Sequence, residues 1–514
     1  MIKFVSTAQM REIDRRAIKD FGLPETILME NAGLESLHYL NECLGGLDGK
    51  RIAVFCGKGN NGGDGFVLAR HLRISGRDCV VYLLASKEEL KGDAKLNMEI
   101  YANIGGRIKE LKTDSDIKKH KIPILHADAY VDALLGTGIN SPLDGIYKTV
   151  VEKMNEWKRF CLAIDIPTGL SSDAGGELGL HVKADATIAF GFPTTGMAFY
   201  PAAASVGKLK TANISFPRQV LDESEFDAFL LDDDCIRQKL PPRPDDAHKG
   251  MFGHAVVTGG ATGMGGAIGL AALAALKVGA GLVTAAVPKV LSLQFELGLK
   301  EVISFHLGDK LDNPDNAQAL TEFCRDKSAL LIGPGMGRGS VLTDIVTEII
   351  ESVKPPIVVD ADGINNLAPN KDVLKKAKSP VVITPHPGEM ARLTGKSARE
   401  INSDRLGSAR EFSREHNCIT VLKGARTVIA SPGGTAYINA TGNANLASGG
   451  TGDVLSGMIA GFISQSVAPV DAAVAAVYLH GLAADIYSEK ENAFSLSASD
   501  LLEYVPRAIT SLLK

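Results

Sequence analysis

Ser-Gly-Gly-Thr-Gly-Asp-Val-Leu-Ser-Gly, residues 448–457, is the stretch that decides how the second half of this chain is interpreted. Glycines precede Asp453, and the apolar run 454–462 that follows predicts a buried helix. Backbone N–H groups of glycine and the positive end of a helix dipole together favour an anion such as phosphate. A carboxylate beside a phosphate usually handles the proton of a hydroxyl that meets the phosphoryl group. The alternative is a glycine C-cap followed by an Asp N-cap, with no ligand.

Size and composition are those of a globular protein. The 514 residues are 45% hydrophobic and 22% charged, and this length allows about three domains of ordinary size. The net charge of −5 offers no basic surface for nucleic acid and no polybasic patch for a membrane. The seven cysteines include no Cys-x-x-Cys pair, which favours reduced thiols in a cytoplasmic protein. We expect no signal peptide, and the apolar stretch 264–276 is too short to span a bilayer.

Two halves meet near residues 217–250. This segment contains the acidic run 222–234 and the proline-rich run 241–244, and both compositions are typical of linkers. We therefore predict one domain over residues 1–220 and a second over residues 225–514.

Short apolar strands alternate with helical patterns in both halves. Strands that are apolar on both faces, separated by helices, predict a parallel sheet covered on each side, which is an α/β fold. The second half closes with two strands around Pro432-Gly433-Gly434, a hairpin signal. Helices are predicted at 66–75 and 87–104. The predicted strands are 51–56, 79–84, 130–135, 160–164 and 186–190 in the first half, and 254–258, 282–287, 329–332, 357–360, 381–384, 419–422, 427–430 and 435–439 in the second.

A glycine-rich segment, residues 57–65, follows the first of these strands. It formally contains Gly-x-Gly-x-x-Gly, but the next strand ends without the acid that a dinucleotide-binding unit places on the ribose. Asn60, Asn61 and Asp64 stand among its glycines. Amide and carboxylate oxygens beside exposed backbone suit a hard cation or a polyhydroxyl ligand. An Asx-rich turn without a ligand is the alternative.

Two further strand ends carry similar groups. Asp132 lies in the predicted strand 130–135, just before the segment 136–140, and Asp165 directly follows the predicted strand 160–164. Because ligands bind beyond the carboxyl ends of the strands in open α/β sheets, these groups should converge on one side of the sheet.

The order of these motifs resembles two known families. The first half, with residues 28–33 (Leu-Met-Glu-Asn-Ala-Gly), 59–65 and 165–169 (Asp-Ile-Pro-Thr-Gly), resembles the NAD(P)H-hydrate epimerase family. The second half resembles the ADP-dependent NAD(P)H-hydrate dehydratase family, and the whole chain resembles the family in which the two are fused. The motifs of the second half are 248–250, 259–260, 333–337, 384–389 and 449–453. The resemblance implies a Rossmann-like three-layer sandwich followed by a ribokinase-like three-layer sandwich.

For the first half, the resemblance implies an epimerase site with a potassium ion held by Asn61, Asp132 and Thr168. Many relatives have serine where this chain has Thr168, whose hydroxyl and carbonyl serve equally well. Asp165 matches the substrate-contacting acid and is the candidate for proton transfer. The implied substrate-binding residues are Asn60, Asn61, Gly62, Gly63, Asp64, Gly136, Thr137, Gly138, Ile139, Asn140, Ser141, Pro142 and Asp165.

For the second half, the resemblance implies a dehydratase site that uses ADP, with Mg²⁺ as the accompanying ion. His386 lies between two prolines, which fixes its loop, although a purely structural role stays open. The choice between Gly335 and Gly337 as the substrate contact also stays open. The implied hydrate-binding residues are Ala267, Gly335, Gly337, His386 and Asp453, and the implied nucleotide-binding residues are Lys423, Gly424, Ala425, Arg426, Thr427 and Gly452.

The implied activity is repair of a damaged nicotinamide cofactor. The epimerase interconverts the R and S hydrates of NADH and NADPH, and the dehydratase converts the S form back to NAD(P)H with release of AMP and phosphate. Asp453 would act on the hydrate hydroxyl and Lys423 on the nucleotide phosphates. The partners implied are small molecules and other copies of the same chain. A small-molecule kinase, and a first half that only binds ligand, are the alternatives.

Overall fold

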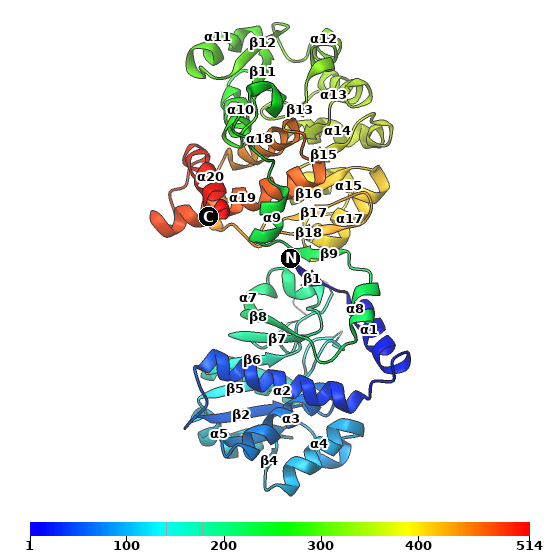
Figure 1. Ribbon diagram of the computed structural model, residues 1–514, viewed down its shortest axis with the longest axis vertical. Coiled ribbons are helices and arrows are strands. Elements are labelled where there is room, and N and C mark those ends of the chain that lie inside the picture. The colour runs from blue at the N-terminus through cyan, green and yellow to red at the C-terminus, as the bar shows by residue number, and fades with distance from the viewer. Residues whose placement is uncertain (140, 174, 176–178) are drawn as a thin grey trace. The chain divides into compact units, whose positions relative to one another are not determined.

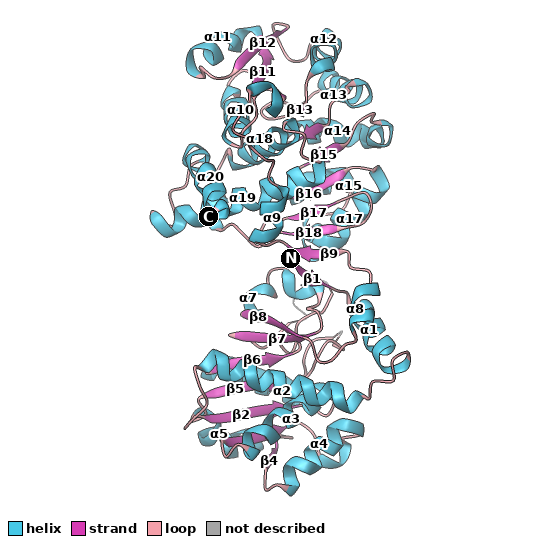
Figure 2. Cartoon of the chain, in the orientation of Figure 1, coloured by secondary structure: helices cyan, strands magenta, loops and turns pink. Residues whose placement is uncertain are grey.

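The computed structural model describes residues 1–514 except 140, 174 and 176–178. Its internal contacts divide the chain into two compact units. One unit is Lys3–Asp227, and the other is Ala228–Lys514 together with Met1–Ile2. Figure 1 traces the chain through them, and Figure 2 shows a sheet flanked by helices in each.

The N-terminal unit is built on a seven-stranded sheet of order β4-β3-β2-β5-β6-β7-β8. All neighbouring strands in it are parallel. Apolar side chains of α2, α3 and α4 fill one face, and those of α5 and α6 fill the other, which gives the predicted three-layer α/β arrangement. The strands are β2 (Arg51–Cys56), β3 (Asp78–Leu83), β4 (Arg107–Glu110), β5 (Ala129–Ala133), β6 (Phe160–Ile164), β7 (Ala186–Phe190) and β8 (Lys208–Ala212). The helices are α1 (Thr7–Lys19), α2 (Glu25–Leu44), α3 (Asn60–Ile74), α4 (Gly92–Asn103), α5 (Asp114–Leu125), α6 (Gly145–Trp157), α7 (Ala203–Val206) and α8 (Arg218–Glu223).

The second unit is built on an 11-stranded sheet of order β1-β9-β18-β17-β16-β15-β14-β13-β10-β11-β12. Its strands from β16 to β12 are parallel, and β17 and β18 form the predicted hairpin. The strands are β1 (Ile2–Phe4), β9 (Ala228–Leu230), β10 (His254–Thr258), β11 (Leu282–Pro288), β12 (Ile303–Leu307), β13 (Ala329–Ile332), β14 (Ile357–Val359), β15 (Val381–Ile383), β16 (Ile419–Leu422), β17 (Val428–Ala430) and β18 (Ala436–Ile438).

Helices cover both faces of this second sheet. One face carries α10, α18, α19 and α20, whose apolar residues form one cluster with the strands, and α13, α14, α15 and α17 lie on the other side (Figure 1). The helices are α9 (Asp233–Lys239), α10 (Gly265–Lys277), α11 (Lys289–Gly298), α12 (Asp315–Phe323), α13 (Ser340–Ser352), α14 (Asp362–Leu367), α15 (Pro387–Thr394), α16 (Ala398–Ser403), α17 (Arg405–His416), α18 (Thr451–Ser464), α19 (Pro469–Lys490) and α20 (Ala498–Leu513).

Glycines let α18 lie directly against α10. A Cβ atom added to Gly457 would be 2.1 Å from the carbonyl oxygen of Ala271, and one added to Gly461 would be 2.8 Å from the Cα atom of Ala275. Both distances are far below van der Waals contact, so any larger residue would force the helices apart. This packing fixes the position of the N-terminus of α18, where the glycine-rich motif lies.

Several local predictions differ from the structure. The predicted helix 87–104 is broken into a 3₁₀ turn, Lys87–Glu89, and α4, because the backbone of Leu90 and Lys91 between them is extended. Helix α3 begins at Asn60 and not near residue 66, so most of the predicted loop is its first turns. The segment 217–250 contains α8, β9 and α9 and is not a plain linker. The strands β1, β4, β8, β9 and β12 were missed because they are short or only partly buried.

The apolar helices serve the core. The stretch 264–276 forms α10, as predicted. Among the described residues, one helix, α19, is long and apolar enough to cross a membrane, and 72% of its apolar window is buried inside the protein. It packs against α18 and α20, so its apolar composition is accounted for by core packing.

Candidate active sites

The first site lies where β2 runs into α3. A Cβ atom on Gly57 would be 2.0 Å from the carbonyl oxygen of Leu134, and one on Gly62 would be 2.0 Å from the carbonyl oxygen of Gly57. Gly63 lies against the flexible side chain of Met29. Gly57 and Gly62 are therefore needed for backbone packing, and they bring the first turn of α3 close to the end of β5.

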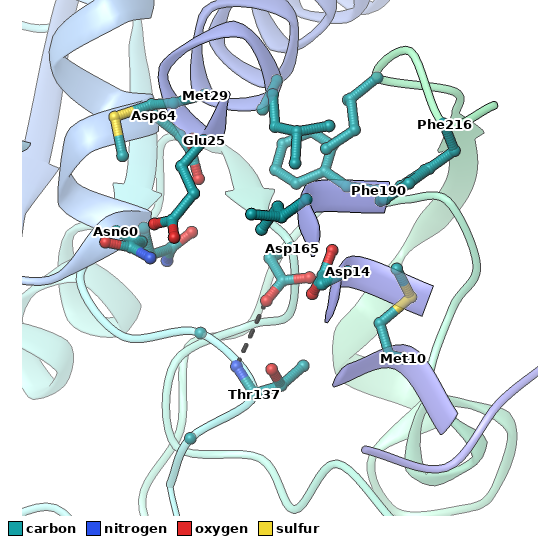
Figure 3. Close-up of a pocket in the computed structure, with 17 residues that line it drawn as sticks. Met10, Asp14, Glu25, Met29, Asn60, Asp64, Thr137, Asp165, Phe190 and Phe216 are labelled. Atoms are coloured by element: carbon teal, nitrogen blue, oxygen red, sulfur yellow. Dashed lines mark hydrogen bonds between the residues drawn. The ribbon is translucent and has the colours of Figure 1, made fainter. Parts of the chain in front are cut away.

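A cavity of about 500 Å³ opens at this end of the sheet. Figure 3 shows polar side chains at one side of it and the rings of Phe190 and Phe216 at the other. The predicted substrate-binding residues that line the cavity are Asn60, Asn61, Asp64, Gly136, Thr137, Gly138 and Asp165. The ones that do not line it are Gly62, Gly63, Ile139, Ser141 and Pro142. Asn140 lies outside the described residues.

Asp165 is held in an unusual conformation at the end of β6. Its φ is 68°, a left-handed value that costs energy for a residue with a side chain. The N–H of Thr137 donates to its Oδ2 at 3.3 Å (Figure 3). A Cβ atom on Gly136 would be 2.8 Å from the same oxygen. Burial raises the pKa of the Asp165 carboxyl to about 6, within the range in which a carboxyl can both give and take a proton.

Asp132 and Thr168 form a buried oxygen-rich cluster. The hydroxyl of Thr168 donates to Asp132 Oδ1 and its N–H donates to Oδ2, both at 2.8 Å. Burial raises the pKa of Asp132 to about 6. Nearby Asn61 has both its amide oxygen and its amide nitrogen buried without a hydrogen-bond partner, which is costly unless a ligand satisfies them.

The cavity also contains acidic residues that the sequence analysis missed. Asp14 on α1 and Glu25 at the start of α2 both line it. The pKa of Asp14 is raised to about 6, mainly by burial and also by the negative charges of Asp165 and Glu25. Asp14 follows the buried Ile13 on an amphipathic helix, so in the sequence it looks like an ordinary surface charge.

The second site is the N-terminus of α18. Gly450 takes a φ of 90° as the N-cap, and the helix begins at Thr451. Asp453 is therefore the third residue of the helix, and the alternative of an Asp N-cap is wrong. The Thr451 hydroxyl donates to the carbonyls of Leu446 and Ser448, both at 2.9 Å, which holds the preceding glycine turn.

Lys423 lies at the centre of the charges around this helix end. Its Nζ donates to Asp360 Oδ1 at 2.8 Å, and that oxygen also accepts from the hydroxyl of Thr384 at 2.7 Å. A Cβ atom on Gly452 would be 3.5 Å from the same Nζ, so the ammonium reaches the helix N-terminus. Burial and the charge of Asp360, only partly offset by Lys423, raise the pKa of Asp453 to about 7.

Arg405 supports the backbone next to Lys423. Its guanidinium donates to the carbonyls of Leu422 and Lys423 at 2.9 and 3.1 Å, and it is 8% exposed. The predicted nucleotide-binding segment 423–427 then turns outward. Gly424 and Ala425 are exposed, and the Thr427 hydroxyl donates to the Gly424 carbonyl at 2.9 Å.

His386 has a structural contact, and its side chain is half-exposed. It is the N-cap of α15, and its Nδ1 accepts from the N–H groups of Gly388 and Glu389 at 3.0 and 3.3 Å. The Nε2 atom therefore carries the proton of the neutral ring. The side chain is 52% exposed, and Nε2 lies 3.4 Å from Glu389 Oε1.

The remaining predicted substrate residues surround the loop after β13. A Cβ atom on Gly335 would be 3.4 Å from Ala267 Cβ, so these two are neighbours. Gly337 is more open, with Ala261 Cβ as its nearest neighbour at 3.9 Å. Its N–H donates to Asp362 Oδ2 at 3.0 Å.

Together these features define an α/β enzyme with two separate sites. One is a cavity lined with carboxyl groups of raised pKa, suited to proton transfer. The other is a glycine-flanked helix N-terminus with a lysine and a carboxylate, suited to phosphoryl transfer. Across the described residues, no group of three or more His, Cys, Asp and Glu is arranged to hold a metal ion.

Comparisons with known proteins give the family. A family model described as NAD(P)H-hydrate dehydratase matches residues 255–507, and a model of the YjeF-related protein N-terminus matches residues 25–196. The chain is 41% identical to the bifunctional NAD(P)H-hydrate repair enzyme of Moorella thermoacetica, over 99% of this chain and 97% of that protein. It is 32% identical to the enzyme of the same name from Escherichia coli, over 97% and 92%. The chain belongs to this family of bifunctional NAD(P)H-hydrate repair enzymes.

A solved structure is similar to the second half of the chain. It is the ADP/ATP-dependent NAD(P)H-hydrate dehydratase from Bacillus subtilis, co-crystallized with ATP and Mg²⁺. The identity is 31%, the match covers 55% of this chain and 98% of that chain, and the TM-score is 0.49.

The raised pKa of Asp453 predicts an effect on stability. A carboxyl whose pKa rises on folding binds its proton more tightly in the folded state, so its ionisation costs stability as the pH rises from about 4 to about 7. Asp453→Asn removes that cost, because the amide stays neutral. The variant should unfold at a higher denaturant concentration than the parent at pH 8, with a smaller gain at pH 5.

Urea denaturation of the full chain without nucleotide measures this difference. Asp344→Asn, an exposed position on α13, is the matched control and should change the midpoint little at either pH. Equal gains from Asp453→Asn at both pH values would show that ionisation of Asp453 is not the cause.

Proposed function

We propose that this chain repairs hydrated NADH and NADPH in two steps. Residues 1–220 interconvert the R and S hydrates, and residues 225–514 dehydrate the S hydrate to NAD(P)H with ADP, releasing AMP and phosphate. The observation that carries the proposal is the 41% identity to a bifunctional repair enzyme over 99% of the chain. The two separate sites support it, because each has the groups that one of the steps needs.

The epimerisation step needs proton transfer at a carbinolamine. The hydrate carries a hydroxyl on the ring carbon beside the ring nitrogen, and loss and return of that hydroxyl scrambles the stereocentre. Asp165 is the proposed proton-transfer residue, since its carboxyl lines the cavity and its pKa is raised to about 6. The first turn of α3 and the segment 136–142 are the proposed substrate-binding backbone.

We also propose that potassium binds beside this cavity through Asn61, Asp132 and Thr168. These residues fit the ion, because the Asn61 amide oxygen is unpartnered and Asp132 is fully buried without an ion pair to any described residue. Hard cations bind through oxygen ligands. When bound, potassium supplies positive charge that offsets the Asp132 carboxylate.

Potassium should therefore stabilise the protein. Replacing tetramethylammonium with K⁺ at constant ionic strength is expected to raise the unfolding midpoint, because the ion binds the folded state. Asp132→Asn should remove the K⁺ dependence, and Asp128→Asn, at an exposed position before the same strand, should keep it. A K⁺ effect of equal size in Asp132→Asn would place the ion elsewhere.

In the dehydration step, the nucleotide converts a poor leaving group into a good one. We propose that Asp453 orients or deprotonates the hydrate hydroxyl, which then takes the phosphoryl group of ADP. The N–H groups at the start of α18 and the ammonium of Lys423 stabilise the transferring phosphoryl group. The ring nitrogen lone pair then expels phosphate and forms a C=N⁺ bond, and loss of a proton from the adjacent ring carbon restores the dihydronicotinamide. Ala267, Gly335, Gly337 and His386 are the proposed hydrate-binding residues, and Lys423–Thr427 with Gly452 the proposed nucleotide-binding residues.

Mg²⁺ is the proposed companion of ADP. It commonly binds through the phosphates together with one or two carboxylates. Asp360, Glu389 and Asp453 all lie close enough to act on the charge of Lys423, and one or two of them would join the phosphates in holding the ion.

One experiment tests the function as a whole. The full chain is incubated with a mixture of both hydrate epimers and either ADP or ATP, and NAD(P)H absorbance and phosphate release are followed. Consumption of both epimers with ADP is expected. A phosphorylated product released intact would instead identify a small-molecule kinase.

Asp165→Asn should abolish epimerisation and spare dehydration. Loss of one acid–base group typically lowers a rate by about 10²–10⁴-fold, and Asp165 lies in the other unit from Asp453. The variant should consume the S hydrate at the parent rate and leave the R hydrate. Normal consumption of the R hydrate would mean that another group moves the proton.

Asp453→Asn should stop dehydration, because the carboxylate acts on the hydrate hydroxyl. The variant should still bind ADP, because the lost carboxylate repels the nucleotide phosphates. Lys423→Ala should weaken ADP binding first. Calorimetry measures ADP affinity, and single-turnover phosphate release measures the chemistry. If Asp453→Asn loses ADP affinity but keeps its single-turnover rate at saturating ADP, Asp453 is a nucleotide or metal ligand.

We further propose a cytoplasmic homo-oligomer. All seven cysteines are free thiols, in keeping with a reducing compartment. Cell fractionation and light scattering test the two statements, which a membrane-bound or monomeric protein would contradict.

A further inference from the structure

Asp14 has no structural role that explains its position in the cavity. Helix α1 is anchored by its buried residues Ile13 and Ala17, and its first turn is capped by Ser6 and Gln9. The carboxyl group of Asp14 has no hydrogen bond or ion pair within the described residues. It points into the cavity that also contains the carboxyl group of Asp165 (Figure 3).

A second observation indicates that this cavity receives a ligand. Asn61 lines it and is 8% exposed, yet the oxygen and nitrogen of its side-chain amide both lack partners. A folded protein rarely leaves two buried polar atoms unsatisfied unless a ligand completes them. Asp14 is therefore part of a cavity built for a polar molecule.

We propose that Asp14 is a second proton-transfer residue of the epimerase site, paired with Asp165. The inference rests on the proposed epimerase activity. It adds a residue that lies before position 25, where the match to the N-terminal family model begins.

Epimerisation through hydroxyl exchange gives two carboxyl groups distinct tasks. One carboxyl, in its acid form, protonates the ring hydroxyl. The C–O bond breaks, water leaves, and the ring nitrogen lone pair forms a C=N⁺ bond, so the carbon becomes planar. Water then adds to the other face, and the second carboxylate takes its proton. In the reverse direction the two carboxyl groups exchange roles. After each turnover, solvent carries a proton from the carboxyl group that gained one to the carboxyl group that lost one.

The charges around Asp14 allow this exchange of roles. Asp165 follows β6 and Glu25 begins α2, and both face Asp14, while Asp64 on α3 faces Asp165. All of them are acidic, so at neutral pH the cluster favours keeping some of its protons. Asp14 and Asp165 each have a pKa raised to about 6, so each can be acid in one direction and base in the other.

The test compares Asp14→Asn, Asp14→Glu and Glu12→Gln in the full chain. Glu12 lies on the same helix with its side chain 56% exposed and paired with Arg15, outside the cavity. Asp14→Asn should lower kcat for epimerisation at least about 10²-fold with little change in KM. Asp14→Glu should recover part of the rate, and Glu12→Gln should match the parent. Dehydration of the S hydrate with ADP, measured in the same samples, should be unchanged in all three.

The pH profile separates proton transfer from a structural effect. The parent should show a bell-shaped profile for epimerisation, and Asp14→Asn should lose one limb. A complete bell-shaped pH profile, or a parent-like epimerisation rate, in Asp14→Asn would overturn the role of Asp14. In that case the proposed function would stand if Asp165→Asn is still inactive in epimerisation. A parent chain that does not interconvert the epimers would overturn both.

Discussion

Close backbone packing at glycine positions is the constraint on which both sites depend. At Gly57 and Gly62, a Cβ atom would lie 2.0 Å from a carbonyl oxygen, so the start of α3 reaches the end of β5 only because these residues have no side chain. In the second unit, Gly457 lets α18 lie against α10. In both units the same absence of a Cβ atom brings a helix N-terminus to the carboxyl ends of parallel strands, where ligands bind.

The two sites use buried carboxyl groups in different electrostatic settings. In the cavity of the first unit, burial raises the pKa of Asp14, Asp64 and Asp165, and the charge of Asp165 raises the pKa of Asp14 and Asp64 further. Such a cluster suits reversible proton exchange. In the second site, the ammonium group of Lys423 forms a hydrogen-bonded ion pair with Asp360 and lies near Asp453. An ammonium beside backbone N–H groups suits a phosphoryl group, and the nearby carboxylate is available for the hydroxyl that attacks it.

Sequence reasoning was most successful where patterns are local. Strand and helix periodicity predicted the α/β class, and the order of short motifs predicted the family. It was weakest at edge strands such as β4 and β12, whose partial burial weakens the apolar pattern. It also placed the start of α3 six residues too late, because three glycines and an Asn-Asn pair resemble a loop when their packing partners are unknown.

The amino-acid sequence by itself determined the two α/β halves, the glycine-rich helix start with Asp453, and the acids at three strand ends, because each depends on neighbours along the chain. Only the tertiary structure decided that Asp14, on a helix before the first motif, shares a cavity with Asp165, and that Lys423 is bonded to Asp360, 63 residues away. It also decided that His386 caps α15 and that its Nε2 atom lies beside the carboxylate of Glu389. The physical reason is that pKa values and ligand contacts depend on burial and on distances between segments far apart in the chain, which no local pattern contains.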